Sequence, residues 1–165
     1  MNLAYRTGIT VTEPQTFAAD DVAAGGQTPA ANVIHDQFNT AKDLDGGTVP
    51  PVSAHSGKIY ALIAGALTID LTALIGLNSV AVNGTGLKVR AVKIKGQSGA
   101  APITITPGGA NPYNLFGATF KSIVSSDQEI VAYLGDSAPV IGAGAKNISL
   151  AGTGTDKIAI AFVMG

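Results

Sequence analysis

Residues 87–95 read Leu-Lys-Val-Arg-Ala-Val-Lys-Ile-Lys and form the clearest β-strand pattern in the chain. Apolar residues alternate with basic ones from Leu87 to Ala91, and again from Val92 to Lys95, so the apolar positions change phase between Ala91 and Val92. A strand has a side-chain period of two. It keeps its core face across such a change only if a β-bulge absorbs it or the strand turns a corner between sheets. The stretch therefore predicts a β-sandwich or barrel.

The C-terminal stretch Lys157–Met164 agrees with this architecture. Its even-numbered residues from Ile158 and its odd-numbered residues from Ala159 are all apolar. A strand that is apolar on both sides is typical of the middle of a sheet with a layer over each face.

Turn residues divide the rest of the C-terminal region into further short strands. We expect strands at Lys58–Ile63, Leu67–Leu71, Pro102–Thr106, Tyr113–Phe116, Phe120–Val124, Glu129–Leu134 and Asn147–Leu150. The Gly-Thr-Gly sequences at 84–86 and 152–154 predict hairpin turns in which glycine supplies positive φ.

A helix across Ala61–Leu77 is the competing interpretation of the first apolar run. Gly65 and Gly76 interrupt that run, and its residues 67, 69 and 71 alternate with polar ones. Both features favour strands.

Residues 1–57 have a different character. Tyr5–Val11 has the alternation of one strand, but the region after Pro14 is mostly Ala, Gly, Asp, Thr and Pro. We therefore divide the chain into an N-terminal arm or irregular lobe, residues 1–57, and a β-sandwich domain, residues 58–165. The expected fold is all-β, a two-layer antiparallel β-sandwich that is jelly-roll-like and carries an extended N-terminal arm.

The composition limits the classes of function. Only 13% of the residues are charged, about half the usual quarter, and this predicts strands buried on both faces or surface buried in an oligomer. The net charge of −1 comes without a basic stripe, so we expect no nucleic-acid partner. No apolar run is long enough for a membrane helix, and the first residues lack the layout of a signal peptide.

Candidate metal and nucleophile sites are fragments. A metal site would need His35 together with Asp36 or Asp43, and Asp43-Leu-Asp-Gly46 is only part of a calcium loop. Gly96-Gln-Ser-Gly-Ala100 lacks the final glycine of a nucleophile elbow. Local turns explain all of these better, and we expect no metal and no cofactor.

Catalytic carboxylates are equally sparse. A hydrolase built on the sandwich would need two of five aspartates to converge with a histidine: Asp20, Asp21, Asp36, Asp70 and Asp136. Asp70 stands out because it lies in an apolar stretch, where a carboxylate bonded to backbone amides or a solvent-facing strand residue is the simpler interpretation. We therefore expect that the protein is not an enzyme.

The most distinctive segment is Pro102–Gly117, in which an apolar strand leads into a Pro-Gly turn and then an Asn-Pro-Tyr sequence. As a partner-binding loop it would present Asn111, Pro112, Tyr113 and Phe116. As a core hairpin, the interpretation we favour, it would use the aromatic residues to pin its return arm.

Four stretches resemble segments of small virion proteins of tailed bacteriophages. They are Leu67-Thr-Ile-Asp-Leu-Thr72, Leu87–Val92, Ile103–Gly117 and Gly152–Met164, all within the C-terminal region. The family that the chain resembles is the head decoration or cement type, whose members are β-sandwiches or jelly rolls, often trimeric and bound on the capsid.

The resemblance implies a structural role. We expect a decoration subunit of the virion, made in the host cytoplasm, which binds the major capsid protein and its own copies as a homotrimer and has no membrane partner. The alternative is a tail, fibre or adhesion module that binds a glycan or a host surface, for which only four tyrosines and no tryptophan are present for sugar stacking.

Overall fold

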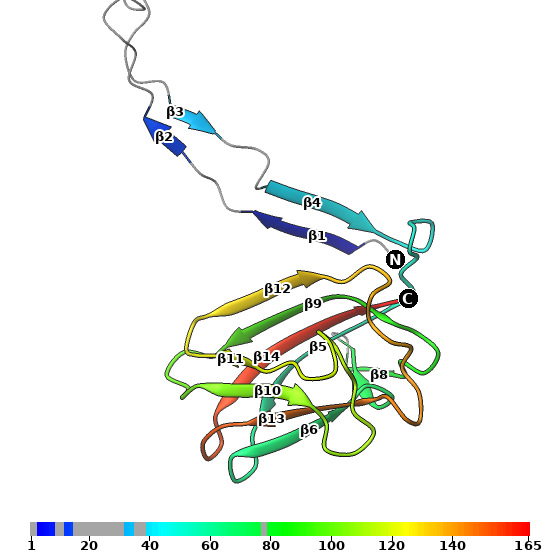
Figure 1. Ribbon diagram of the computed structural model, residues 1–165, viewed down its shortest axis with the longest axis vertical. Helices are drawn as coiled ribbons and strands as arrows, with labels where there is room; N and C mark the ends of the chain where they lie inside the picture. Colours follow the sequence, from blue (N-terminus) through cyan, green and yellow to red (C-terminus); the bar gives the residue numbers. More distant parts are fainter. Residues whose placement is uncertain (1–2, 9–11, 15–31, 35–38, 77–78) are drawn as a thin grey trace, which may run out of the picture. The chain divides into compact units, whose positions relative to one another are not determined.

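The computed structural model describes residues 3–8, 12–14, 32–34, 39–76 and 79–165. Leu3–Asp43 forms one compact unit, and Leu44–Gly165 lies in the other. The described strands confirm the all-β prediction (Figure 1). Among the described residues, no helix is long and apolar enough to cross a membrane.

The first unit contains two small two-stranded sheets, called here together the N-terminal ribbon. Strand β1 (Leu3–Gly8) pairs with β4 (Asn39–Leu44), and β2 (Thr12–Pro14) pairs with β3 (Asn32–Ile34). The strand expected from Tyr5 to Val11 ends at Gly8, and residues 9–11 lie outside the described residues.

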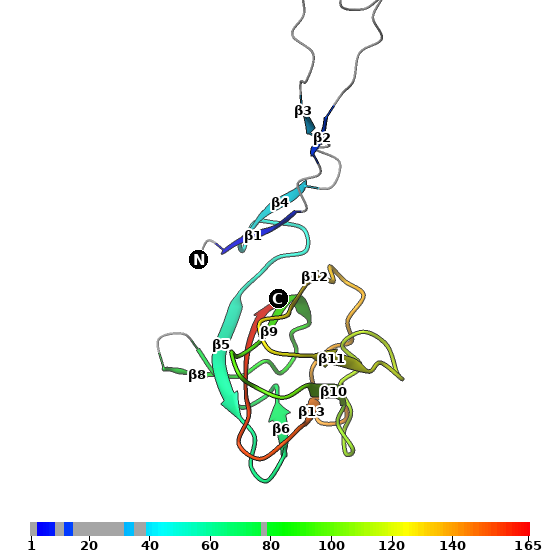
Figure 2. The same cartoon turned by 90° about the vertical axis from the view of Figure 1, so that its left-hand side faces the viewer.

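The second unit is a two-layer sandwich of antiparallel sheets (Figure 2). Sheet I has the strand order β12-β9-β14-β5, and sheet II has the order β11-β10-β13-β6. In sheet I the strands are β5 (Ala54–Ala61), β9 (Val89–Gly96), β12 (Glu129–Tyr133) and β14 (Lys157–Met164). In sheet II they are β6 (Ala66–Asp70), β10 (Ile103–Pro107), β11 (Ser122–Val124) and β13 (Asn147–Ala151).

The pairing within the sheets follows a single rule. The first of these eight strands pairs with the last, the second with the second last, and so inward: β5 with β14, β6 with β13, β9 with β12, and β10 with β11. A long hairpin rolled over itself gives this order, which is a jelly roll. A small pair, β7 (Leu74–Ile75) and β8 (Ala81–Val82), is inserted between the second and third strands.

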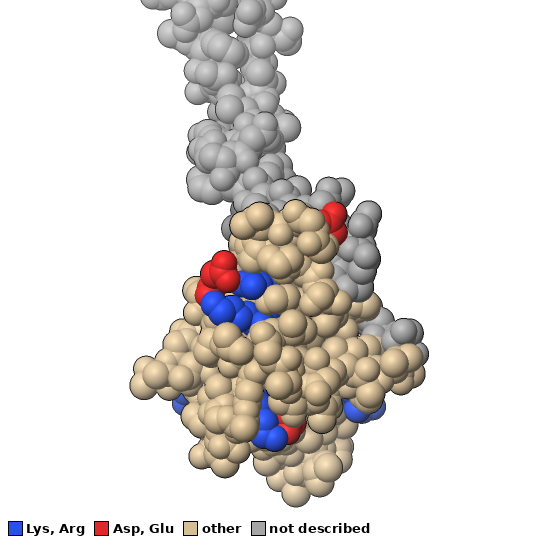
Figure 3. Space-filling view, turned by 90° about the vertical axis from the view of Figure 1, so that its right-hand side faces the viewer, with Lys and Arg blue, Asp and Glu red and all other residues tan. Residues whose placement is uncertain are grey.

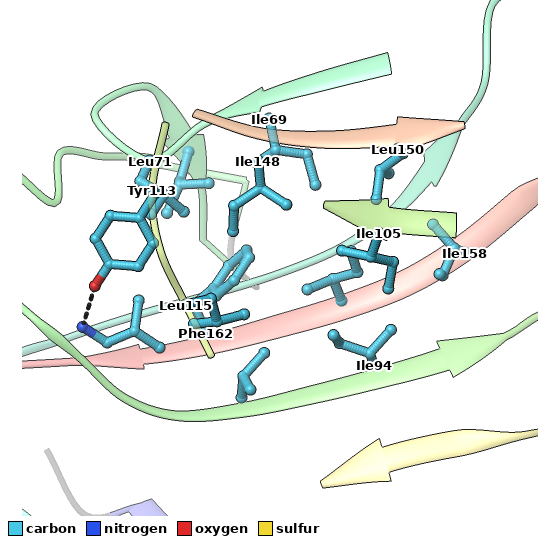
Figure 4. Close-up of a cluster of buried hydrophobic side chains, with 14 of the residues drawn as sticks. Ile69, Leu71, Ile94, Ile105, Tyr113, Leu115, Ile148, Leu150, Ile158 and Phe162 are labelled. Carbon is cyan, nitrogen blue, oxygen red and sulfur yellow. Dashed lines mark hydrogen bonds between the residues drawn. The ribbon is translucent and has the colours of Figure 1, made fainter. Parts of the chain in front are cut away.

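The core lies between the two sheets, because β10, β13 and β14 alternate buried and partly exposed residues, and β9 does so from Val92 onward, after its bulge. On β14 the even-numbered side chains from Ile158 to Met164 are at most 3% exposed. Ile105 of β10 and Ile148 of β13 meet them from sheet II (Figure 4). Burying such a side chain fully is worth about 1.5–3 kcal/mol, so this layer supplies most of the favourable energy.

The phase change predicted in the Leu87–Lys95 strand is a β-bulge, displaced by one residue. Ala91 lies opposite Val163 and Val89 lies opposite Met164, so Arg90 is the extra residue. The bulge keeps Val89 and Val92 in the same core, as the phase change requires.

The strands favoured in the first apolar run are confirmed as β6 and β7. The competing helix is excluded because Ala64 and Gly65 adopt positive φ of 50° and 82°, which a right-handed helix does not allow. One local prediction is wrong: Tyr113–Phe116 is not a strand. It lies within the long connection from β10 to β11 and makes only isolated bridges.

The two Gly-Thr-Gly turns also differ from the prediction. Gly86 and Gly154 do adopt positive φ, of 82° and 51°. Each turn, however, leads between strands that do not pair with each other: β8 to β9, and β13 to β14. They are crossovers rather than hairpins.

The boundary expected after residue 57 falls inside β5. The sandwich unit begins at Leu44, and both Leu44 and Val52 are core residues, 1% and 2% exposed. The backbone of Ser53 donates to the Met164 carbonyl at 2.9 Å, which fixes this irregular segment to the end of β14.

Candidate contact surfaces

The predicted contact loop lies in the connection between β10 and β11. Asn111 and Pro112 are exposed, and the Asn111 carbonyl accepts hydrogen bonds from the backbone amides of Lys146 and Asn147, both at 3.0 Å. The loop is therefore fastened to the beginning of β13, and its tip faces solvent.

Tyr113 is not available to a partner. Its side chain is 0% exposed, its hydroxyl donates to the Pro139 carbonyl at 2.9 Å, and it accepts from the Val89 amide at 3.1 Å (Figure 4). Burial raises the pKa of this phenol above its usual range. As a contact residue Tyr113 is a wrong prediction; it belongs to the core, and its burial removes one of the four tyrosines available for sugar stacking.

Phe116 lies between these two cases. Its ring meets that of Phe120 edge to face, with centroids 5.4 Å apart, and it is half-buried. Together with Leu115, Leu134 and Pro139 it lines a hollow of about 590 Å³ on the flank of the sandwich. The aromatic pair therefore pins the returning chain, as the favoured interpretation of this segment predicted.

Asp70 is part of an ion pair. Its carboxylate accepts from the Lys146 ammonium at 2.6 Å and from both the amide and the hydroxyl of Thr72, at 2.8 and 2.6 Å. Burial by itself raises the pKa of Asp70, but these hydrogen bonds outweigh that effect and bring the pKa below its usual range. The interaction ties the end of β6 to the segment that precedes β13.

Asp136 has different partners. Its carboxylate pairs with the Arg90 guanidinium and lies 3.6 Å from the Lys88 ammonium, and the Arg90 hydrogen bond lowers the pKa of Asp136. Arg90 also donates to the Gly135 carbonyl at 3.0 Å. The bulged residue thus fixes the loop after β12, and Asp70 and Asp136 do not share a cation.

The remaining candidates for chemistry lie in turns or outside the described residues. The Asp45 carboxylate accepts from the Gly47 amide at 2.7 Å, as in an ordinary Asx turn. Ser98 lies exposed in the turn between β9 and β10. His55 lies on β5, opposite Val163 of β14. His35, Asp36, Asp20 and Asp21 lie outside the described residues. The part of the chain that the structure describes contains no group of three metal-ligating side chains.

The outer face of sheet II is mixed. One row across it is polar, with Thr106, Ser149 and Thr68 side by side on β10, β13 and β6. The next row is largely apolar: Ile123 of β11, which is 55% exposed, Thr104, Ala151 and Ala66.

The outer face of sheet I is different. One row across it is Gly57, Ala161 and Lys93, and the next is Ile59, Ala159 and Lys95. These six residues line a hollow of about 320 Å³, called here the β14 trough. The floor is low because glycine and alanine occupy it, with Lys58 and Ile59 of β5 on one side and Lys93 and Lys95 of β9 on the other.

The sequence predicted apolar residues on both sides of β14 but assigned a covering layer to each face. Sheet II covers only the inner face of β14, and Ala159 and Ala161 remain partly exposed. Ile59 is 55% exposed, a high value for a large apolar residue on a strand. The alternation of alanine with core residues in Lys157–Met164 was the signal for this surface, because alanine fits either an exposed or a covered face.

Charge is sparse elsewhere on the surface as well. In Figure 3 most of the visible face belongs to uncharged residues, and the acidic and basic side chains gather in a few places. The ion pairs given above, together with Lys93–Glu129 at 3.1 Å, account for much of the charge on the sandwich.

Comparison with known proteins adds nothing to this geometry, because no family model, curated protein or solved structure matches the chain. Since one fold hosts many functions, the function has to be argued from the surfaces.

Proposed function

We propose that this chain is a structural virion protein of a bacteriophage, a capsid decoration or cement subunit that stabilises the head lattice through protein–protein contacts. The observation that carries the proposal is the combination of a jelly-roll sandwich with a separate N-terminal ribbon. Jelly rolls recur in viral capsid proteins, although also in lectin domains and cupins.

The ribbon supports a role in assembly. A two-stranded sheet is at best marginally stable alone in water, because it lacks a second layer against which to bury a face. Its outer edges also carry unpaired backbone groups that pair readily with another chain. Both properties are liabilities in an isolated molecule and useful ones in a lattice, where a neighbouring subunit covers the ribbon.

The sandwich supports the same role. Sheet I exposes a small-residue hollow flanked by Ile59, and sheet II exposes Ile123 beside a row of hydroxyl groups. Exposed apolar area of this kind favours burial against a neighbouring subunit. The expected partners are the major capsid protein and further copies of the chain, arranged as a homotrimer around a symmetry axis.

Two measurements test the proposal. Mass spectrometry of purified phage particles should find the chain in a fixed ratio to the major capsid protein, and light scattering of the purified protein at micromolar concentration should give the mass of a homo-oligomer. A monodisperse monomer that shows no affinity for capsids would overturn the proposal.

A further inference from the structure

The β14 trough has the features of a protein–protein interface without a bound partner. Its floor, Ala159 and Ala161 of β14, can be approached closely by another backbone because neither residue projects beyond Cβ. The exposed Ile59 offers apolar area at one rim, where Lys58 also lies, and Lys93 and Lys95 offer charge at the other. Apolar centres with polar rims are characteristic of protein interfaces.

The lysines argue against packing of two troughs face to face. In such a symmetric contact Lys58, Lys93 and Lys95 of both copies would gather, and Glu129 of each copy, paired with Lys93, would offset part of this charge. Like charges brought together in a contact oppose association. The complementary surface is therefore an acidic one, and the contact is heterologous.

The chain itself contains such a partner. Residues 1–43 carry five acidic residues (Glu13, Asp20, Asp21, Asp36 and Asp43) and two basic ones (Arg6 and Lys42), a net charge of −3. Residues 44–165 carry six acidic and eight basic residues, a net charge of +2. The overall charge of −1 thus conceals two units of opposite sign.

We propose that the β14 trough of one subunit binds the N-terminal ribbon of a second copy. The ribbon is acidic, and it needs a surface against which to pack; the trough is apolar and rimmed by lysines. A heterologous contact of this kind closes into a ring when the rotation between copies allows it. The inference rests on the proposed function, since it specifies how the expected oligomer forms.

The first test is a matched pair of charge reversals in the full-length protein. Lys95→Glu lies on the rim of the trough, and Lys121→Glu is an exposed control ahead of β11. Each changes the net charge by the same amount. In sedimentation velocity at low salt, Lys95→Glu should weaken association by about tenfold, equivalent to about 1.4 kcal/mol, while Lys121→Glu should leave it unchanged.

The second test identifies the occupant. Wild-type protein grown with light and with heavy nitrogen is mixed, reassembled and treated with a carbodiimide, which joins lysine amines to carboxylates. We expect mixed heavy–light cross-links between peptides that contain Lys93 or Lys95 and peptides from residues 1–43. Cross-links only between peptides of the same label would show that the ribbon lies on its own sandwich and would overturn the inference.

The outcomes separate this inference from the proposed function. If the wild type associates and Lys95→Glu associates as tightly, the trough is not the interface, and the proposed function stands. If Lys95→Glu loses binding to capsids but keeps its self-association, the trough binds the capsid protein instead, and the inference is wrong. A wild-type protein that neither associates nor binds capsids removes the proposed function itself. Equal urea midpoints for both variants confirm that they fold.

Discussion

Tyr113→Phe isolates the part played by a single buried hydroxyl group. That hydroxyl connects β9 to the loop after β12, because it accepts from the Val89 amide and donates to the Pro139 carbonyl. The ring itself stays in place in the variant, so apolar burial hardly changes. Only the two hydrogen bonds are removed.

The loss of the hydroxyl has a different free-energy cost at the Val89 amide than at the Pro139 carbonyl. Val89 is 0% exposed, so its amide cannot reach water and bears the penalty of a buried unpaired donor, about 1–3 kcal/mol. Pro139 is partly exposed, and its carbonyl can bond to water at little cost. We therefore expect the free energy of unfolding to fall by about 2 kcal/mol. For a chain of this size that lowers Tm by about 4–8 °C.

Urea and thermal unfolding followed by circular dichroism measure this change. The matched control is Tyr60→Phe, since Tyr60 is a half-buried tyrosine on edge strand β5 whose hydroxyl hydrogen-bonds to the Ser56 side chain. If Tyr113→Phe costs no more than Tyr60→Phe, the hydroxyl is not the connection described above. Retained self-association by folded Tyr113→Phe would agree with a purely structural role for this residue.

Two further predictions concern packing and pH. A Cβ on Gly108 would lie 2.5 Å from the Cβ of Asn147, whereas one on Gly109 would meet nothing within 4 Å. Gly108→Ala should therefore lower the free energy of unfolding by about 1–3 kcal/mol, seen as a lower urea midpoint, and Gly109→Ala should leave that midpoint unchanged. The pKa of Asp70 is lower in the folded state than in the unfolded one, so the stability from its pair with Lys146 is present above about pH 4 and is lost as the pH falls through the folded-state pKa. Asp70→Asn should make unfolding free energy less dependent on pH in that acidic range, and an unchanged pH profile would contradict this.

Much of the fold could be predicted because strand patterning is local. Alternation in Leu87–Lys95 and Lys157–Met164 gave the two central strands of sheet I, and the phase change gave the bulge to within one residue. A period of two requires only that neighbouring side chains point to opposite faces, and no information about distant residues is needed.

The errors arose where a distant partner decides the conformation. Gly84–Gly86 and Gly152–Gly154 require turns, but a turn does not specify which sheet the next strand joins. Tyr113–Phe116 has the composition of a strand. It lacks a strand partner because β10 is already flanked by β11 and β13.

The sequence by itself determined that the chain is β, where most strands lie, and that β14 is apolar on both sides, since these follow from residue type and spacing. Only the tertiary structure decided that Tyr113 is an internal connection and that the alanine side of β14 is an open trough. Burial depends on what packs against a residue. In a rolled β-fold those neighbours come from strands far away in the sequence, as β5 and β14 do from opposite ends of the sandwich.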